Sequence, residues 1–125
     1  MSVFAPALGA LWKQLEGYGI DPALLFREEG IDPDTMFDSG ARIPAEKYQR
    51  LDKKAAELSE DPYFGLKGSE YFRPAHLGAL GFAWLASSTL RTAFERLSRY
   101  SRIIQEKLTI DLSEDDSFYY VRVDA

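Results

Sequence analysis

Few side chains in this sequence could do catalytic chemistry. It contains one histidine, His76, and no cysteine, which excludes thiolate nucleophiles, thiolate zinc sites and sites built from several histidines. His76 lies two residues after Pro74, at an expected helix start. It could serve as a base there, but histidines at helix ends more commonly have packing or capping roles. The sequence therefore predicts no enzyme, no catalytic residue, no metal and no other cofactor.

Two further patterns resemble ligand-binding motifs only in part. The acidic segment 32–38 is similar to a calcium loop, but Pro33 and Met36 break the EF-hand pattern. Gly78 and Gly81 lack the preceding strand and the Lys-Ser/Thr pair of a phosphate-binding loop. Both glycines fall in an expected helix, where small residues let another element approach the backbone closely.

Aromatic residues supply the remaining material for a binding site. Several of them, between residues 63 and 94, could wall an apolar pocket between helices with Arg73 as its polar group. The candidate ligand-binding residues are Tyr71, Arg73, His76 and Trp84. An apolar or carboxylate-bearing metabolite would suit an arginine among aromatic rings.

The overall charge argues against direct contact with nucleic acid. Fifteen Lys and Arg residues against twenty Asp and Glu give a net charge of −5. A local basic cluster nevertheless runs from Arg91 to Arg102. The candidate partner-contact residues are Arg91, Arg99, Arg102, Tyr119 and Val121. A solvated helix face is the alternative interpretation of this cluster.

The elements that must position these residues are mostly helices. Apolar residues at helical spacing predict helices at about residues 8–16, 43–58, 74–86 and 90–104, within a helical region of about 5–105. Asp-Pro pairs at 21–22, 32–33 and 61–62 predict three further helix starts. The most apolar stretch, 77–86, is far shorter than the ~20 residues that span a bilayer, so no membrane contact is expected. Without a targeting signal, the sequence predicts a cytoplasmic domain.

The periodicity changes near the end of the chain. Residues 108–112 alternate between apolar and polar, 113–116 form a polar turn, and 118–123 are aromatic and β-branched. These features predict a hairpin at about 107–124 and an α+β fold, mostly helical, with a C-terminal antiparallel β-hairpin. A two-stranded hairpin is marginal alone, so we expect a truncated sheet that helices, further strands or a second copy complete.

Several segments resemble one protein family in their order and spacing. They are ARIPAEKY (41–48), LSEDPYFGL (58–66), FRPAHLGALG (72–81), SSTLRTAF (87–94) and LSRY (97–100). The family is the N-terminal effector-binding ("arabinose-binding-like") region of bacterial AraC-type transcription regulators. The resemblance covers nearly the whole chain.

The resemblance implies a function that the residues alone do not. Residues 1–125 would form the sensor part of a regulator, controlling a helix-turn-helix DNA-binding domain that this chain lacks. It implies a small-molecule effector and a homodimer, with DNA bound only through the other domain. Arabinose itself is not inferred, because the sugar-binding jelly roll of the founding regulator is strand-rich. The alternatives are a pure protein–protein interaction module, a small enzyme that depends on His76, and direct DNA binding.

Overall fold

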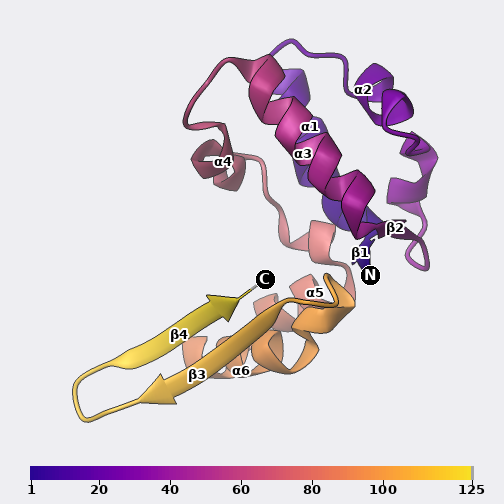
Figure 1. The fold of residues 1–125 in the computed structure, drawn as a ribbon. Coiled ribbons are helices and arrows are strands. Elements are labelled where there is room, and N and C mark those ends of the chain that lie inside the picture. The colour runs from indigo at the N-terminus through magenta and orange to yellow at the C-terminus, as the bar shows by residue number, and fades with distance from the viewer. Residues whose placement is uncertain (125) are drawn as a thin grey trace.

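The computed structural model describes residues 1–124 and arranges them in two groups of elements (Figure 1). The helical group, residues 2–70, contains β1 (Ser2–Phe4), η1 (Ala5–Leu8), α1 (Gly9–Gly17), α2 (Pro22–Glu28), η2 (Pro33–Phe37), β2 (Arg42–Pro44), α3 (Ala45–Ser59), α4 (Phe64–Lys67) and η3 (Gly68–Glu70). The hairpin group, residues 74–124, contains η4 (Pro74–Leu77), α5 (Ala79–Leu85), α6 (Leu90–Tyr100), η5 (Ser101–Ile103), β3 (Thr109–Glu114) and β4 (Tyr119–Asp124). The η elements are short 3-10 helices. The predicted fold class, mostly helical α+β with a C-terminal antiparallel hairpin, is confirmed.

Side-chain caps set several of the helix starts. The Asp21 carboxylate accepts hydrogen bonds from the backbone N–H groups of Ala23 and Leu24, at 3.0 and 3.3 Å. Asp32 caps η2 in the same way, and the Thr89 hydroxyl accepts from the Thr92 N–H at the start of α6. These caps satisfy amide groups that have no partner inside the helix. The helix starts predicted at Asp21 and Asp32 are confirmed.

The main core lies in the helical group, between α1, α2 and α3. Leu15, Phe26 and Leu51 are fully buried in it, and the Trp12 ring packs edge-on against Phe26 with ring centres 5.2 Å apart. The buried Gln14 side chain donates to the Phe64 carbonyl at 2.7 Å, which ties α1 to α4. Helix α1 is therefore held from three sides, and its remaining face borders the site described below.

Two antiparallel strand pairs complete the fold. The short strands β1 and β2 pair with Val3 opposite Ile43, and β1 also bonds to the hairpin group, through the Phe4 N–H and the Ile104 carbonyl at 2.7 Å. The sequence analysis expected a helix start at Ile43 and no strand at residues 2–4. That interpretation was wrong, because backbone pairing with a distant segment, rather than local periodicity, makes these residues extended.

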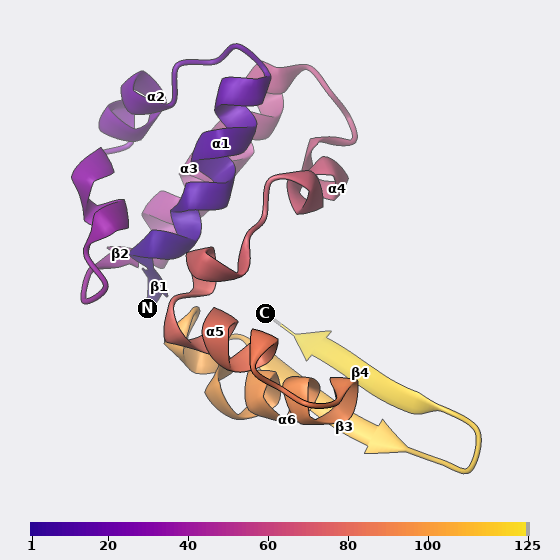
Figure 2. The same ribbon diagram turned by 180° about the vertical axis from the view of Figure 1, so that it is seen from behind.

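The C-terminal hairpin packs against α6 through β3 and extends beyond the helix at its turn (Figure 2). Ile110 lies opposite Val123, and Leu112 lies opposite Val121. The turn falls after Glu114, not at residues 113–116 as predicted. The reason is Asp115, whose carboxylate accepts from the backbone N–H groups of Ser117 and Phe118 and so fixes the turn two residues later, at 115–118.

The helix predicted from Pro74 to residue 86 is broken at Gly78. Gly78 has φ 59° and ψ −136°, a backbone conformation that residues with a side chain rarely adopt. The chain therefore forms η4, turns, and begins α5 at Ala79. Likewise, the helix predicted after Asp61-Pro62 starts at Phe64. Among residues 1–124, every helix is too short or too polar to cross a membrane.

Candidate functional site

A groove runs along the face of α1 that the core leaves free. It consists of two hollows, of about 510 and 480 Å³, that share Lys13 and His76. The larger hollow, the inner part, reaches across to α2 and η2. Its other lining residues are Pro6, Gly9, Trp12, Ala23, Arg27, Pro33, Asp34, Met36, Phe37 and Ala75. The outer part is lined in addition by Glu16, Gly17, Glu70, Tyr71 and Arg73. We call the two together the α1 groove.

Two glycines of α1 let the segment 70–76 lie directly against the helix. A Cβ atom at Gly9 would come within 2.7 Å of the His76 ring, and one at Gly17 within 2.4 Å of the Tyr71 hydroxyl. Lys13 lies midway between them, one helical turn from each, on the same face of α1. The helix thus seats His76 and Tyr71 at two fixed places, with a lysine between them.

Hydrogen bonds fix the orientation of the His76 ring. Its Nδ1 accepts from the Arg73 backbone N–H at 3.0 Å, which closes the first turn of η4. Burial lowers the pKa of His76, and the neighbouring positive charges of Arg73 and Lys13 lower it further. The neutral ring therefore carries its hydrogen on Nε2, which makes no hydrogen bond to any of residues 1–124. The Nε2–Cδ2 edge of the ring lies against Gly9 of α1, a residue that also lines the inner part of the groove.

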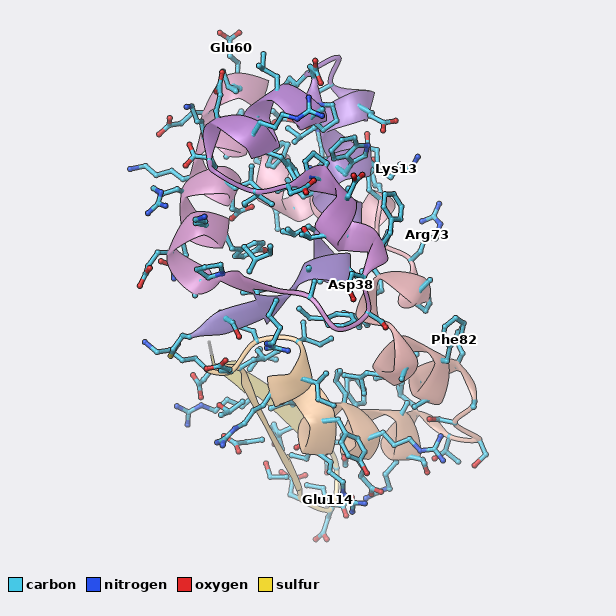
Figure 3. The ribbon with its side chains drawn as sticks, turned by 90° about the vertical axis from the view of Figure 1, so that its right-hand side faces the viewer. Lys13, Asp38, Glu60, Arg73, Phe82 and Glu114 are labelled. Carbon is cyan, nitrogen blue, oxygen red and sulfur yellow. The ribbon has the colours of Figure 1, made fainter. Side chains whose placement is uncertain are left out.

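Positive charge predominates in the inner part of the groove. Lys13 has only a long, exposed contact to Glu16, at 3.9 Å, and Arg27 has no ion pair within the part of the chain that the structure describes. Asp34 is the carboxylate of this inner part. Lys13 and Arg73 project from the same side of the molecule (Figure 3). A chain with a net charge of −5 thus presents a local group of cations beside an apolar floor.

Comparison with known proteins identifies the family. Residues 19–125 match the family described as "Arabinose-binding domain of AraC transcription regulator, N-term". The chain belongs to this family. The AraC-type resemblance predicted from the short motifs is therefore confirmed, and the family is one of regulatory domains of transcription regulators.

A curated relative is similar over most of this AraC-type domain. The ornithine utilization regulator of Pseudomonas aeruginosa is 25% identical over 107 residues, which cover 86% of this chain and 32% of the relative. The domain therefore spans about a third of the length of the curated relative it matches.

The structure brings together three of the four predicted ligand-binding residues. Tyr71, Arg73 and His76 line the outer part of the α1 groove of this AraC-type domain. Trp84 lies elsewhere, in a separate apolar hollow of about 220 Å³ between η4, α5 and α6. Phe72 and Pro74 border that hollow too, so residues 71–74 alternate between the two sites. That any of these four binds a ligand stays a prediction.

The predicted partner-contact residues fall into two groups. Arg91 forms a double hydrogen bond with the Glu114 carboxylate, at 2.6 and 2.9 Å, and lies 4.9 Å from the Tyr119 ring centre. These residues join α6 to the hairpin. Arg99 and Arg102 are exposed, and Val121 is 38% exposed on β4. Contact of any of them with a partner stays a prediction.

Sequence reasoning missed the residues that α1 and α2 contribute to the groove. The helical spacing of residues 8–16 puts Trp12 on the apolar stripe of its helix, and no sequence pattern singled out Lys13 or Arg27. One signal was present: Gly9, Lys13 and Gly17 follow one another at four-residue spacing, which places a lysine between two small residues on one helix face. Their position opposite His76, more than fifty residues away, depends on tertiary packing.

Proposed function

We propose that this chain is the effector-sensing domain of a transcription regulator and binds a small molecule in the α1 groove. One observation carries the proposal: the chain belongs to a family of regulatory domains and has a groove of two adjoining hollows. The groove is lined by α1, α2, η2 and the segment that leads to the hairpin group. Apolar surface with a few convergent polar groups is typical of small-molecule sites. Sensing of this kind requires no catalysis.

The groove also adjoins the hairpin group through η4, and a sensor needs such a contact between its ligand site and the rest of the domain. His76 lies in η4, which packs directly on α5. A ligand between α1 and His76 would therefore contact both groups of elements at once. It can shift their arrangement only if it binds one arrangement more tightly than another, which is the requirement for regulation by a ligand.

A metabolite screen by thermal shift tests the proposal. A ligand at a hundredfold its Kd stabilises the domain by about 2.7 kcal/mol, which raises its melting temperature by several degrees. The Arg73→Ala variant removes a residue of the groove wall, and Arg99→Ala, exposed on α6, is the matched control. We expect the variant to weaken the response to a hit and the control to keep it. Equal responses of wild type, Arg73→Ala and Lys13→Gln to every hit would contradict the assignment, because Arg73 lines the outer part of the groove and Lys13 lines both parts.

We also propose that DNA contact in the whole regulator belongs to a part other than residues 1–125. The net charge of −5 supports this, because DNA binding by a domain depends on excess positive charge. In a mobility-shift experiment with this chain alone, we expect no complex at 150 mM salt. A salt-sensitive complex would contradict the proposal.

The exposed strand β4 supports self-association as a second proposed role. Val121 and Val123 are 38% and 59% exposed on the hairpin face that packs on α6, and β4 forms hydrogen bonds to β3 alone among the described strands. Unpaired strand edges with apolar side chains commonly pair with another chain. Sedimentation over a range of concentrations, with Val123→Lys as the variant, tests for a homodimer that the substitution weakens.

A further inference from the structure

The inner part of the α1 groove has a composition that selects among classes of effector. Its floor and walls are apolar and include Met36, two prolines and the Trp12 ring. The Trp12 ring is half-buried and packs against Phe26. Phe37 also lines the hollow, and 85% of its surface is exposed. Leaving a phenyl ring in contact with water is unfavourable, because its burial would stabilise the protein. A ligand with an apolar body would cover this ring and Trp12 together.

The polar groups of this inner part are mostly donors. Lys13 and Arg27 carry positive charges without a close ion pair among residues 1–124, and His76 offers its Nε2 hydrogen. Three donors around an apolar hollow suit one compact anion. A phosphate site is typically built from backbone amides of a helix N-terminus or a glycine-rich loop, whereas these donors are side chains. A neutral sugar needs many paired donors and acceptors, which this apolar lining does not supply.

We infer that the inner part of the α1 groove binds a monocarboxylate with an apolar body. The carboxylate lies between Lys13 and the His76 Nε2–H, and the apolar body lies on Trp12 and Phe37. The inference rests on the proposed function and gives it a ligand class.

Tryptophan fluorescence tests the inference at the site itself. The chain has two tryptophans, so Trp84→Phe leaves Trp12 as the reporter of the groove. The variant is first checked for an unchanged circular dichroism spectrum and cooperative melting. It is then titrated with phenylacetate and with phenylacetamide, with 4-methylpentanoate and its amide, and separately with L-arabinose and with inorganic phosphate. Each acid–amide pair has the same shape and differs in charge.

We expect each carboxylate to bind at least tenfold more tightly than its amide. Lys13→Gln removes the charge from an exposed position and should abolish most of that preference. Lys53→Gln, an exposed lysine on α3 away from the groove, is the matched control and should leave the preference intact. His76→Leu, which removes the Nε2–H donor, should reduce carboxylate binding as a second, independent test.

The outcomes separate the ligand class from the proposed function. If amides bind as tightly as carboxylates, or if only L-arabinose or inorganic phosphate changes Trp12 fluorescence, the groove is a ligand site but the carboxylate assignment is overturned. If none of these compounds and no member of the metabolite screen binds in the groove, both the ligand class and the sensing function are overturned.

Discussion

At the scale of single residues, Asp61 is the most strongly constrained carboxylate. It accepts hydrogen bonds from the Tyr18 hydroxyl at 2.6 Å, the Lys67 ammonium at 2.7 Å and the Tyr63 backbone N–H at 2.8 Å. The Lys67 hydrogen bond and then the Tyr18 hydrogen bond lower the pKa of Asp61 to about 2. One ionised side chain thus joins the end of α1 to the start of α4.

This arrangement predicts a specific acid sensitivity. Because the folded-state pKa of Asp61 lies below its unfolded value, its contribution to stability is present above about pH 4 and is lost as the pH falls toward 2. We expect Asp61→Asn to lower the urea midpoint at pH 7, and the difference from wild type to shrink between pH 4 and pH 2. Asp116→Asn, in the exposed hairpin turn, is the control. A difference that does not change with pH would contradict this account.

Residue roles could be predicted where the partners are close in sequence. The caps at Asp21 and Asp32 follow from hydrogen bonds that span two or three residues, and a sequence carries that information locally. Arg73 and His76 could be grouped for the same reason. Lys13 could not, because nothing along the chain indicates that α1 turns this residue toward a segment sixty residues later.

At the scale of elements, the close contact between η4 and α5 requires a glycine, which has no side chain, at position 81. Gly81 lies in α5, where a Cβ atom would be 1.7 Å from the Pro74 carbonyl oxygen and 2.6 Å from its carbon. Both are backbone atoms, which cannot rotate away. The small residues that the sequence analysis expected to allow close approach do so here, and Pro74 of η4 is the segment that approaches.

Gly81→Ala should therefore separate η4 from α5. Overpacking of this kind typically costs about 1–3 kcal/mol, more than the ~1 kcal/mol that alanine gains over glycine in a helix. We expect a lower free energy of unfolding in urea. Gly65→Ala in α4, where a Cβ would meet no atom within 4 Å, should be neutral or stabilising. A Gly81→Ala chain as stable as the Gly65→Ala chain would show that η4 moves without cost.

Element types were predictable where a pattern runs long enough. The first hairpin strand alternates between apolar and polar residues, the second is rich in aromatic and β-branched residues, and α6 repeats apolar residues over three turns, so all three were recognised. Strands β1 and β2 have three residues each, which is too short for any period to appear. Gly78 interrupts an apolar run that reads as one helix, because its positive φ is a property of the fold and not of the residues around it.

At the scale of the whole molecule, β1 and Arg42 join the helical group to the hairpin group. The Arg42 guanidinium donates to the Ser2 hydroxyl at 2.6 Å, to the Ser2 carbonyl at 3.3 Å and to the Ile103 carbonyl at 2.7 Å. The Ser2 hydroxyl in turn donates to the Glu106 carboxylate at 2.6 Å. A single side chain from β2 thus binds β1 and the segment before β3, alongside the backbone pairing of β1 with that segment.

Because the α1 groove lies on one group and leads into the other, an effector bound there, as proposed, would act on the whole domain through this junction. Arg42→Ala should destabilise the chain by up to about 1 kcal/mol, since it removes hydrogen bonds from a charged donor at an exposed site. The loss should be local: we expect faster hydrogen exchange in peptides covering residues 1–8 and 101–108, with little change in α3. Arg102→Ala, a neighbouring exposed arginine, should leave exchange in both peptides as in wild type. Equal acceleration across α3 would mean that the two groups unfold as one unit, and that an effector in the groove could not move one group without unfolding the other.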